Sequence, residues 1–134
     1  MTEQPARRQQ IAVQVARVTL EPDGTISFVM RPGACLDAAN TRELLQAFTQ
    51  LAGNLPRRIL VHSRGLRSQD RRSREMCSAP ELARLVDRVA VIALNPVARV
   101  LTAFFVRVSK PRYPMRLFET EQAARAWLHG QGQT

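Results

Sequence analysis

Two short stretches near the N-terminus alternate apolar and polar residues, which predicts two β-strands. The first stretch has apolar residues at every second position, with a shift of one residue in its second half, at Ile11, Val13, Val15, Val18 and Leu20. Such a shift is typical of a strand with a bulge. The second strand is predicted from Thr25 to Arg31, and Glu21-Pro22-Asp23-Gly24 between them suits a turn, so the two strands should form an antiparallel hairpin.

Three further apolar runs predict strands farther along the chain. Ile59-Leu60-Val61 and the segment Val89–Leu94 are continuous runs, as expected for central strands that are covered on both faces. Met115 to Phe118 follows the chain break at Tyr113-Pro114 and predicts a last strand.

Apolar residues spaced by three and four positions predict helices between these strands. Asp37 can cap the first helix, whose stripe is Leu44, Leu45, Phe48, Leu51 and Ala52, and Gly53-Asn54 ends it. Pro80 opens a short helical turn. Asn95 and Pro96 begin a helix whose apolar stripe is Val97, Val100, Leu101, Phe104, Phe105 and Val108, with Phe104 and Phe105 expected in the core. Thr120-Glu121 begins a last helix that Gly130 terminates.

This order of elements predicts an α/β fold with a mixed sheet of about five strands and about four helices. Strands separated by helices need crossover connections, so an N-terminal antiparallel hairpin should be followed by parallel strands. We predict one domain over 11–130, a disordered leader over 1–10 and a tail over 131–134. In such sheets, binding sites lie beyond the carboxyl ends of the strands.

The formal net charge of +9 has two explanations, an anionic partner or a bias in composition, and we favour the bias. Lys110 is the only lysine, and a preference for arginine over lysine also arises from GC-rich coding without selection for binding. The two cysteines and two histidines show no zinc-site spacing, so no metal or cofactor is expected. The chain has no long apolar run and no signal-peptide pattern, which favours a cytoplasmic protein with reduced thiols.

Positive charge is concentrated after the Ile59–Val61 run. Between positions 57 and 74 the chain carries seven arginines and a single acid, Asp70. A helix beginning near Ser68 or Gln69 would place Asp70 in its first turn, where backbone donors and arginine forks could bind a phosphate or carboxylate. The alternative, which we favour for a run of charges, is a solvated helix face with Arg72 or Arg74 paired to Asp70, Glu75 or Glu81.

Single residues that could carry chemistry have simpler structural explanations. His62 follows a predicted strand and could titrate near neutrality, but a hydrogen-bonded histidine at a strand end is the more common case. Cys77 has arginine neighbours, yet a small buried hydrophobe is the expected role. No nucleophile, histidine and acid share a known catalytic spacing, so we do not expect an enzyme.

The C-terminal run Lys-Pro-Arg-Tyr-Pro-Met-Arg-Leu-Phe, followed by Ala-Arg-Ala-Trp-Leu, resembles the STAS family of sulfate transporters and anti-sigma factor antagonists. The resemblance covers residues 12–130 and includes the Asn95-Pro96 helix start. It implies a STAS-like fold and a non-catalytic switch that binds a protein partner. In the antagonist branch a serine in an Asp-Ser-Ser-Gly-like motif is phosphorylated. Here Asp70 matches the motif aspartate, but Arg71-Arg72 replaces the serines and Ser73 replaces the glycine.

These observations together predict a regulatory or interaction module that binds a protein partner or a small anionic ligand. The predicted binding residues are Arg67, Asp70, Arg71, Arg72, Ser73, Arg74 and Asn95. A basic surface that binds nucleic acid or an anionic membrane is the alternative, and an enzyme is a second alternative. An exposed apolar patch on the helix after Asn95 would favour a homodimer.

Overall fold

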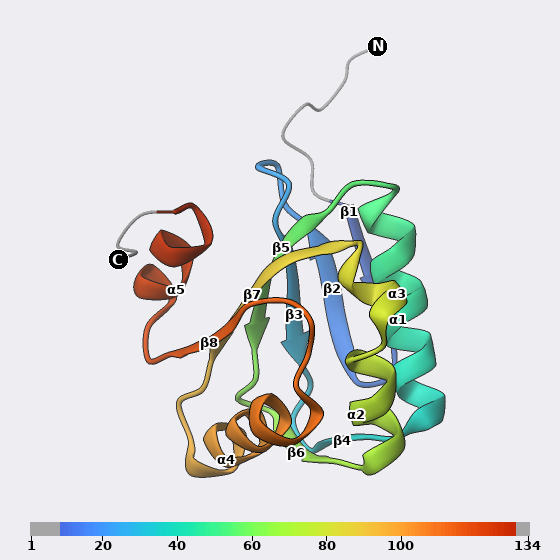
Figure 1. The fold of residues 1–134 in the computed structure, drawn as a ribbon, viewed down its shortest axis with the longest axis vertical. Helices are drawn as coiled ribbons and strands as arrows, with labels where there is room; N and C mark the ends of the chain where they lie inside the picture. The colour runs from blue at the N-terminus through green and yellow to red at the C-terminus, as the bar shows by residue number, and fades with distance from the viewer. Residues whose placement is uncertain (1–8, 131–134) are drawn as a thin grey trace.

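The computed structural model describes residues 9–130, and a six-stranded mixed sheet lies at its centre (Figure 1). In spatial order its strands are β1 (Gln9–Ala12), β2 (Ala16–Leu20), β3 (Ile26–Met30), β5 (Arg57–His62), β7 (Val86–Ile92) and β8 (Met115–Phe118). β1, β2 and β3 pair antiparallel, whereas β3, β5, β7 and β8 pair parallel. The predicted fold class, with an antiparallel N-terminal edge followed by parallel crossovers, is confirmed.

Helices cover both faces of this sheet. They are α1 (Ala38–Ala52), α2 (Arg71–Cys77), α3 (Pro80–Ala83), α4 (Pro96–Phe104) and α5 (Glu121–Leu128). α1 packs on β2 and β3 and α3 contacts β7, whereas α5 packs on β5, β7 and β8 from the opposite side (Figure 1). Successive side chains of β5 point to opposite faces of the sheet. Ile59 therefore lies in the larger core, whereas Leu60 lies in the smaller core with Trp127.

Side-chain caps begin the longer helices where the sequence predicts them. The Asp37 carboxylate accepts a hydrogen bond from the Asn40 backbone N–H at 2.9 Å, and the Asn40 side chain accepts one from the Asp37 N–H. Asn95 caps α4, and Thr120 caps α5. These caps satisfy backbone donors that a helix start leaves unpaired.

The single bulged strand predicted over 11–20 is wrong, because this stretch forms two strands. β1 and β2 are joined by a tight reversal in which the Val13 N–H donates to the Ala16 carbonyl at 2.9 Å. Val13 and Val15 are buried within the reversal, so the shift in the apolar pattern marks a change of chain direction. β1 also takes in Gln9 and Gln10, which the prediction placed in the leader. The rest of the leader (1–8) and the tail (131–134) lie outside the described residues.

A second, two-stranded parallel sheet was not predicted. It consists of β4 (Ala34–Leu36) and β6 (Leu66–Gln69), which gives the described residues eight strands rather than about five. The prediction had placed a loop and a helix start at Ser68 or Gln69. A strand here carries no sequence signal, because β6 is mostly polar and no residue of it is fully buried.

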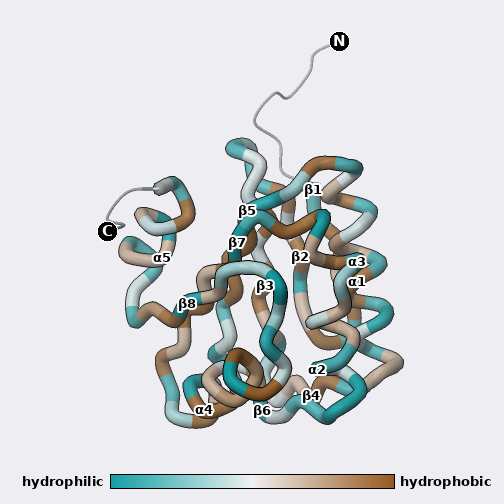
Figure 2. The backbone as a smooth tube through the Cα atoms, viewed as in Figure 1, coloured by the Kyte–Doolittle hydropathy of each residue, from teal (hydrophilic) through white to brown (hydrophobic). Residues whose placement is uncertain are grey.

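Most of the apolar stripe of α4 does not face the core, which corrects the prediction for Phe104. Phe105 is only 4% exposed, but Phe104 is 43% and Val100 65% exposed. α4 lies beyond the carboxyl ends of the strands, where it contacts β6, and it continues into a π-helical turn, η1 (Phe105–Ser109). Figure 2 shows hydrophobic residues in the central strands and also along α4 at the edge of the fold.

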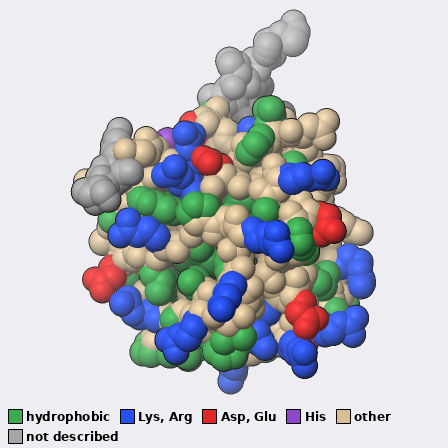
Figure 3. Space-filling model, in the orientation of Figure 1, with side chains coloured by type: hydrophobic (Ala, Val, Ile, Leu, Met, Phe, Trp, Pro, Cys, Tyr) green, Lys and Arg blue, Asp and Glu red, His purple; other side chains and the backbone are tan. Residues whose placement is uncertain are grey.

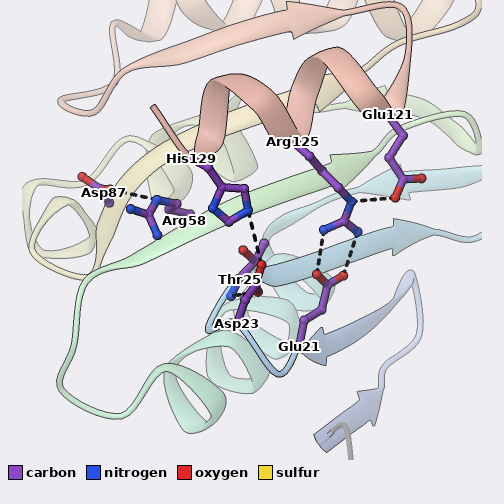
Figure 4. A network of polar contacts seen from close by, with 8 residues as sticks. All are labelled: Glu21, Asp23, Thr25, Arg58, Asp87, Glu121, Arg125 and His129. Atoms are coloured by element: carbon purple, nitrogen blue, oxygen red, sulfur yellow. Dashed lines mark hydrogen bonds and ion pairs between the residues drawn. The ribbon is translucent and has the colours of Figure 1, made fainter. Parts of the chain in front are cut away.

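Charged side chains fasten α5 to the turn between β2 and β3 (Figure 4). The Arg125 guanidinium donates to both carboxylate oxygens of Glu21, at 2.8 and 3.1 Å, and to Glu121 at 2.7 Å. The His129 imidazole lies 3.3 Å from the Asp23 carboxylate, which accepts a hydrogen bond from the Thr25 N–H. A bidentate arginine–carboxylate pair fixes orientation as well as distance, so this contact sets the position of α5 on the sheet.

We expect the protein to lose stability in acid, because the ion pairs of this network are lost when its carboxylates are protonated. Burial alone raises the pKa of Asp23, but hydrogen bonds from Thr25 and the nearby His129 and Arg125 outweigh it and hold that pKa below its usual value. The hydrogen bond from Arg125 likewise lowers the pKa of Glu121. Because both values are lower in the folded than in the unfolded chain, the stabilisation is present above about pH 4 and is lost as the pH falls through the folded values.

Urea denaturation at a series of pH values from about 6 to about 2 measures this loss. The variant Glu121→Gln should show a flatter pH dependence than the wild type. Glu81→Gln, at an exposed position of α3 outside the network, is the control and should keep the wild-type slope. An unfolding free energy that is constant or rises on acidification would contradict the expectation.

Candidate functional site

An open groove of about 650 Å³ lies at the edge of the sheet where β3, β5 and β7 end. It is lined by the ends of these strands, by the segments that follow them and by the first turn of α4, at Val29, Met30, Pro32, Gly33, His62, Arg64, Gly65, Leu66, Arg67, Ile92, Leu94, Asn95 and Val97. The groove therefore occupies the position that the sequence analysis expects for a site in a parallel sheet.

Asn95 holds the floor of the groove together. Its side-chain oxygen accepts a hydrogen bond from the Ala98 N–H at 2.8 Å, and its amide donates to the Arg64 carbonyl at 2.9 Å. The same side chain thus caps α4 and ties the segment after β7 to the segment after β5. Ser63 reinforces this link from below, since its buried hydroxyl donates to the Ile92 carbonyl at 2.8 Å.

Gly65 allows the segment after β5 to lie directly against the end of β3. A Cβ atom at this position would overlap the Arg31 carbonyl and lie 2.8 Å from the Met30 carbonyl oxygen. The Gly65 carbonyl also accepts a hydrogen bond from the Ala34 N–H at 3.0 Å. This wall of the groove therefore requires glycine at position 65, because any side chain would push the two segments apart.

The groove combines positive charge with exposed apolar surface. His62, Arg64 and Arg67 line it, and its lining residues include no aspartate or glutamate. Leu94, Val97 and Val29 are exposed beside these groups, with Leu94 59% exposed. This chemistry suits a ligand that presents carboxylates or phosphates together with apolar groups.

The structure divides the seven residues predicted for the site. Arg67 and Asn95 line the groove, whereas the residues from Asp70 to Arg74 do not. Asp70 is the N-cap of α2 and accepts a hydrogen bond from the Ser73 N–H at 2.9 Å. α2 therefore begins at Arg71, and Ser68 and Gln69 belong to β6, which corrects the predicted helix start.

Ser73 has a structural role between two helices. It is fully buried, and its hydroxyl oxygen accepts hydrogen bonds from the Thr41 hydroxyl at 2.6 Å and from the Gln69 amide at 3.2 Å. The contact joins α2 to α1. A binding partner or a kinase cannot reach this hydroxyl in the folded protein, so including Ser73 among the binding residues was wrong.

Of the three arginines of α2, Arg71 and Arg72 lie on a solvated face, as the favoured interpretation of this run predicts, whereas Arg74 is half-buried. Arg71 pairs with Glu75 at 3.1 Å, whereas the prediction named Arg72 or Arg74 for an ion pair. Arg74 instead donates to the Gln69 carbonyl at 3.0 Å, and its guanidinium lies 4.8 Å from the centre of the Phe104 ring. Arg72 is exposed to solvent. None of these three side chains lines the groove.

The sequence analysis missed the exposed apolar residues of the groove and underrated Arg64. The sequence did contain a signal for these residues, namely their place at the ends of predicted strands. His62 and Arg64 lie within three residues of the end of one apolar run, and Leu94 ends the next. Cys77 was expected to be a small buried residue; its side chain is half-buried and lines the apolar core together with Tyr113. Within residues 9–130, no helix is long and apolar enough to span a membrane. The same residues contain no group of three histidine, cysteine or acidic side chains that could hold a metal ion.

The fold is a small mixed α/β domain with an open groove at one edge of its sheet, and comparisons with known proteins place the chain in a family. The chain belongs to the family described as "Domain of unknown function (DUF7793)", which matches residues 18–131. No curated protein matches the chain.

The solved structures that match the chain include the following two. One is an uncharacterised protein of the DUF3478 family from Shewanella loihica PV-4, described as having a SpoIIAA-like fold. It is 16% identical, with a TM-score of 0.56 over 91% of this chain and 92% of that one. This similarity confirms the STAS-like fold and shows the fold alone. The other, a protein of unknown function from Arthrobacter sp. FB24, is 24% identical over 84% and 97% of the two chains, with a TM-score of 0.30 that carries no structural argument.

We expect Asn95 to stabilise both α4 and the floor of the groove. Asn95→Ala removes the cap and the bond to the Arg64 carbonyl, so it should lower the unfolding free energy by about 1–2 kcal/mol. Asn95→Asp keeps an oxygen that accepts from the Ala98 N–H but loses the amide donor. In urea denaturation, the unfolding free energy should therefore be highest for the wild type, lower for Asn95→Asp and lowest for Asn95→Ala. Equal stability of all three proteins would show that neither hydrogen bond contributes.

Proposed function

We propose that this protein is a non-catalytic, STAS-like interaction module whose groove binds an acidic segment of a protein partner. The observation that carries the proposal is the pairing of Arg64 and Arg67 with exposed apolar residues in a groove whose lining has no acidic side chain. A partner segment with acidic and apolar residues is complementary to this surface in charge and in hydrophobicity.

The shape of the groove favours a peptide segment over a small anion. The space is open along the ends of three strands, and the arginines at its rim are exposed. A small anion in such a place would remain in contact with water, where each ion pair contributes little. A longer segment also buries Leu94 and Val97, which adds apolar contact area. The STAS resemblance supports this proposal, since STAS domains generally act as switches that bind protein partners.

An anionic membrane surface is the second candidate. The exposed valines and Phe104 of α4 lie on the same helix as the exposed Arg99, and Arg107 follows in η1. An apolar helix face with cations beside it can lie in the headgroup region of a bilayer, and the net charge of +9 would strengthen this attraction. The same apolar face is also the natural place for a homodimer contact.

Fluorescence anisotropy with a labelled peptide of alternating glutamate and leucine tests the proposal. The double variant Arg64→Glu/Arg67→Glu should weaken binding about tenfold or more, because it places like charges in the groove. The matched control is Arg71→Glu/Arg72→Glu, which changes the net charge by the same amount on α2 and should bind within about twofold of the wild type. A peptide of alternating lysine and leucine should not bind.

Equal weakening by both double variants would mean that overall charge drives binding, and it would overturn the groove proposal. Sedimentation with vesicles of phosphatidylglycerol and phosphatidylcholine tests the second candidate with the same proteins. If the wild type binds these vesicles but not the acidic peptide, the proposal of a protein partner is wrong and the membrane proposal is supported.

A further inference from the structure

We infer that a cavity in the larger core is a binding site for a small, uncharged, apolar molecule. The cavity has a volume of about 130 Å³ and lies between the sheet and the helices on the α1 side. Phe28, Val89 and Val91 of the sheet form its floor, while Leu44 and Phe48 of α1 and Phe105 of η1 form its walls. No charged side chain lines it.

The chemistry of the wall determines the class of ligand. Two hydroxyl groups of the wall are already engaged within the protein, since the Ser63 hydroxyl donates to the Ile92 carbonyl and the Tyr113 hydroxyl donates to the Cys77 carbonyl, each at 2.8 Å. The Gln69 amide likewise donates to Ser73. The Cys77 thiol remains protonated at neutral pH, because burial raises its pKa to about 11. A charged ligand would be left without a counter-charge in this wall, whereas an apolar ligand would not.

The size of the cavity sets the size of the ligand. Protein interiors are close-packed and hold few voids larger than a water molecule. An apolar cavity of about 150 Å³ engineered in another protein stays dry and binds benzene. The cavity described here is slightly smaller and also mainly hydrocarbon-lined. It therefore suits a single aromatic ring or a branched hydrocarbon of similar volume.

The segment between η1 and β8 forms a strap over this cavity. In Figure 1 it crosses in front of the sheet, and Figure 3 shows hydrophobic side chains on the same face with Lys and Arg side chains around them. The strap begins at Lys110, which has a φ of 49°, and Pro114 is fixed to β7 by a hydrogen bond from the Val89 N–H at 2.9 Å. Tyr113 lines the cavity and latches the strap to the end of α2 through Cys77.

Benzene is a suitable probe, and methyl ¹H–¹³C NMR spectra report where it binds. In the wild type, benzene should shift the methyl signals of Val89, Val91 and Leu44 in a saturable manner. Val91→Phe fills the cavity with a ring of its own and should weaken benzene binding at least about tenfold. The control Val100→Phe makes the same exchange on the exposed side of α4 and should bind as the wild type does. Tyr113→Phe removes the latch and should speed benzene exchange severalfold with little change in affinity.

Benzene shifts confined to the exposed residues of α4, or no saturable shift up to the solubility of benzene, would overturn the inference. Equal binding by the wild type and Val91→Phe would overturn it as well. If Val91→Phe fails to fold, Thr102→Met fills the cavity from α4 and takes its place, because Thr102 is buried and lines the same space. These outcomes are independent of the acidic-peptide experiment, since none of the variants alters Arg64 or Arg67.

Discussion

The parallel pairing of β5 with β7 is the constraint on which the rest of the structure depends. Ile59 is the register partner of Val89 and Leu60 that of Ala90, so the two strands present one apolar row to each face of the sheet. One row enters the core beneath α1 and α3, and the other enters the core beneath α5. Burying each large apolar side chain contributes about 1.5–3 kcal/mol, and strands of this kind are stable only when both faces are covered.

The same pairing creates the candidate site. Because the two strands run in the same direction, the segments after them leave the sheet at one edge, where Asn95 and Ser63 connect them. The groove lies outside this edge and the apolar cavity lies inside it. Met30 and Leu66 line both, so these two side chains form the wall between a charged, open surface and a hydrocarbon-lined interior. A single layer of side chains thus separates the groove from the cavity.

The sequence predicted the parts of the fold that local chemistry determines. The continuous runs around Leu60 and Ala90, the caps at Asp37, Asn95 and Thr120 and the turn at Gly24 all have their signals within a few residues. It could not predict β6, since that strand gains its partner β4 from a distant part of the chain. The burial of Ser73 and the exposure of Phe104 also depend on how whole helices are placed. The groove lies at the edge of the sheet where the sequence placed a site, whereas five of the seven predicted residues lie farther along the chain, at the start of α2.

Amide hydrogen exchange of the native protein, read residue by residue, tests the central claim most directly. If β5 and β7 form one buried unit, the amides of Leu60, Val61, Ala90 and Val91 should exchange only through global unfolding, with the same opening free energy as denaturation gives. The amides around Arg64 and Val97 should open more easily. Exchange of the β5 amides at a clearly lower free energy than those of β7 would contradict the account. The two strands at whose ends the groove lies would then not unfold as one unit.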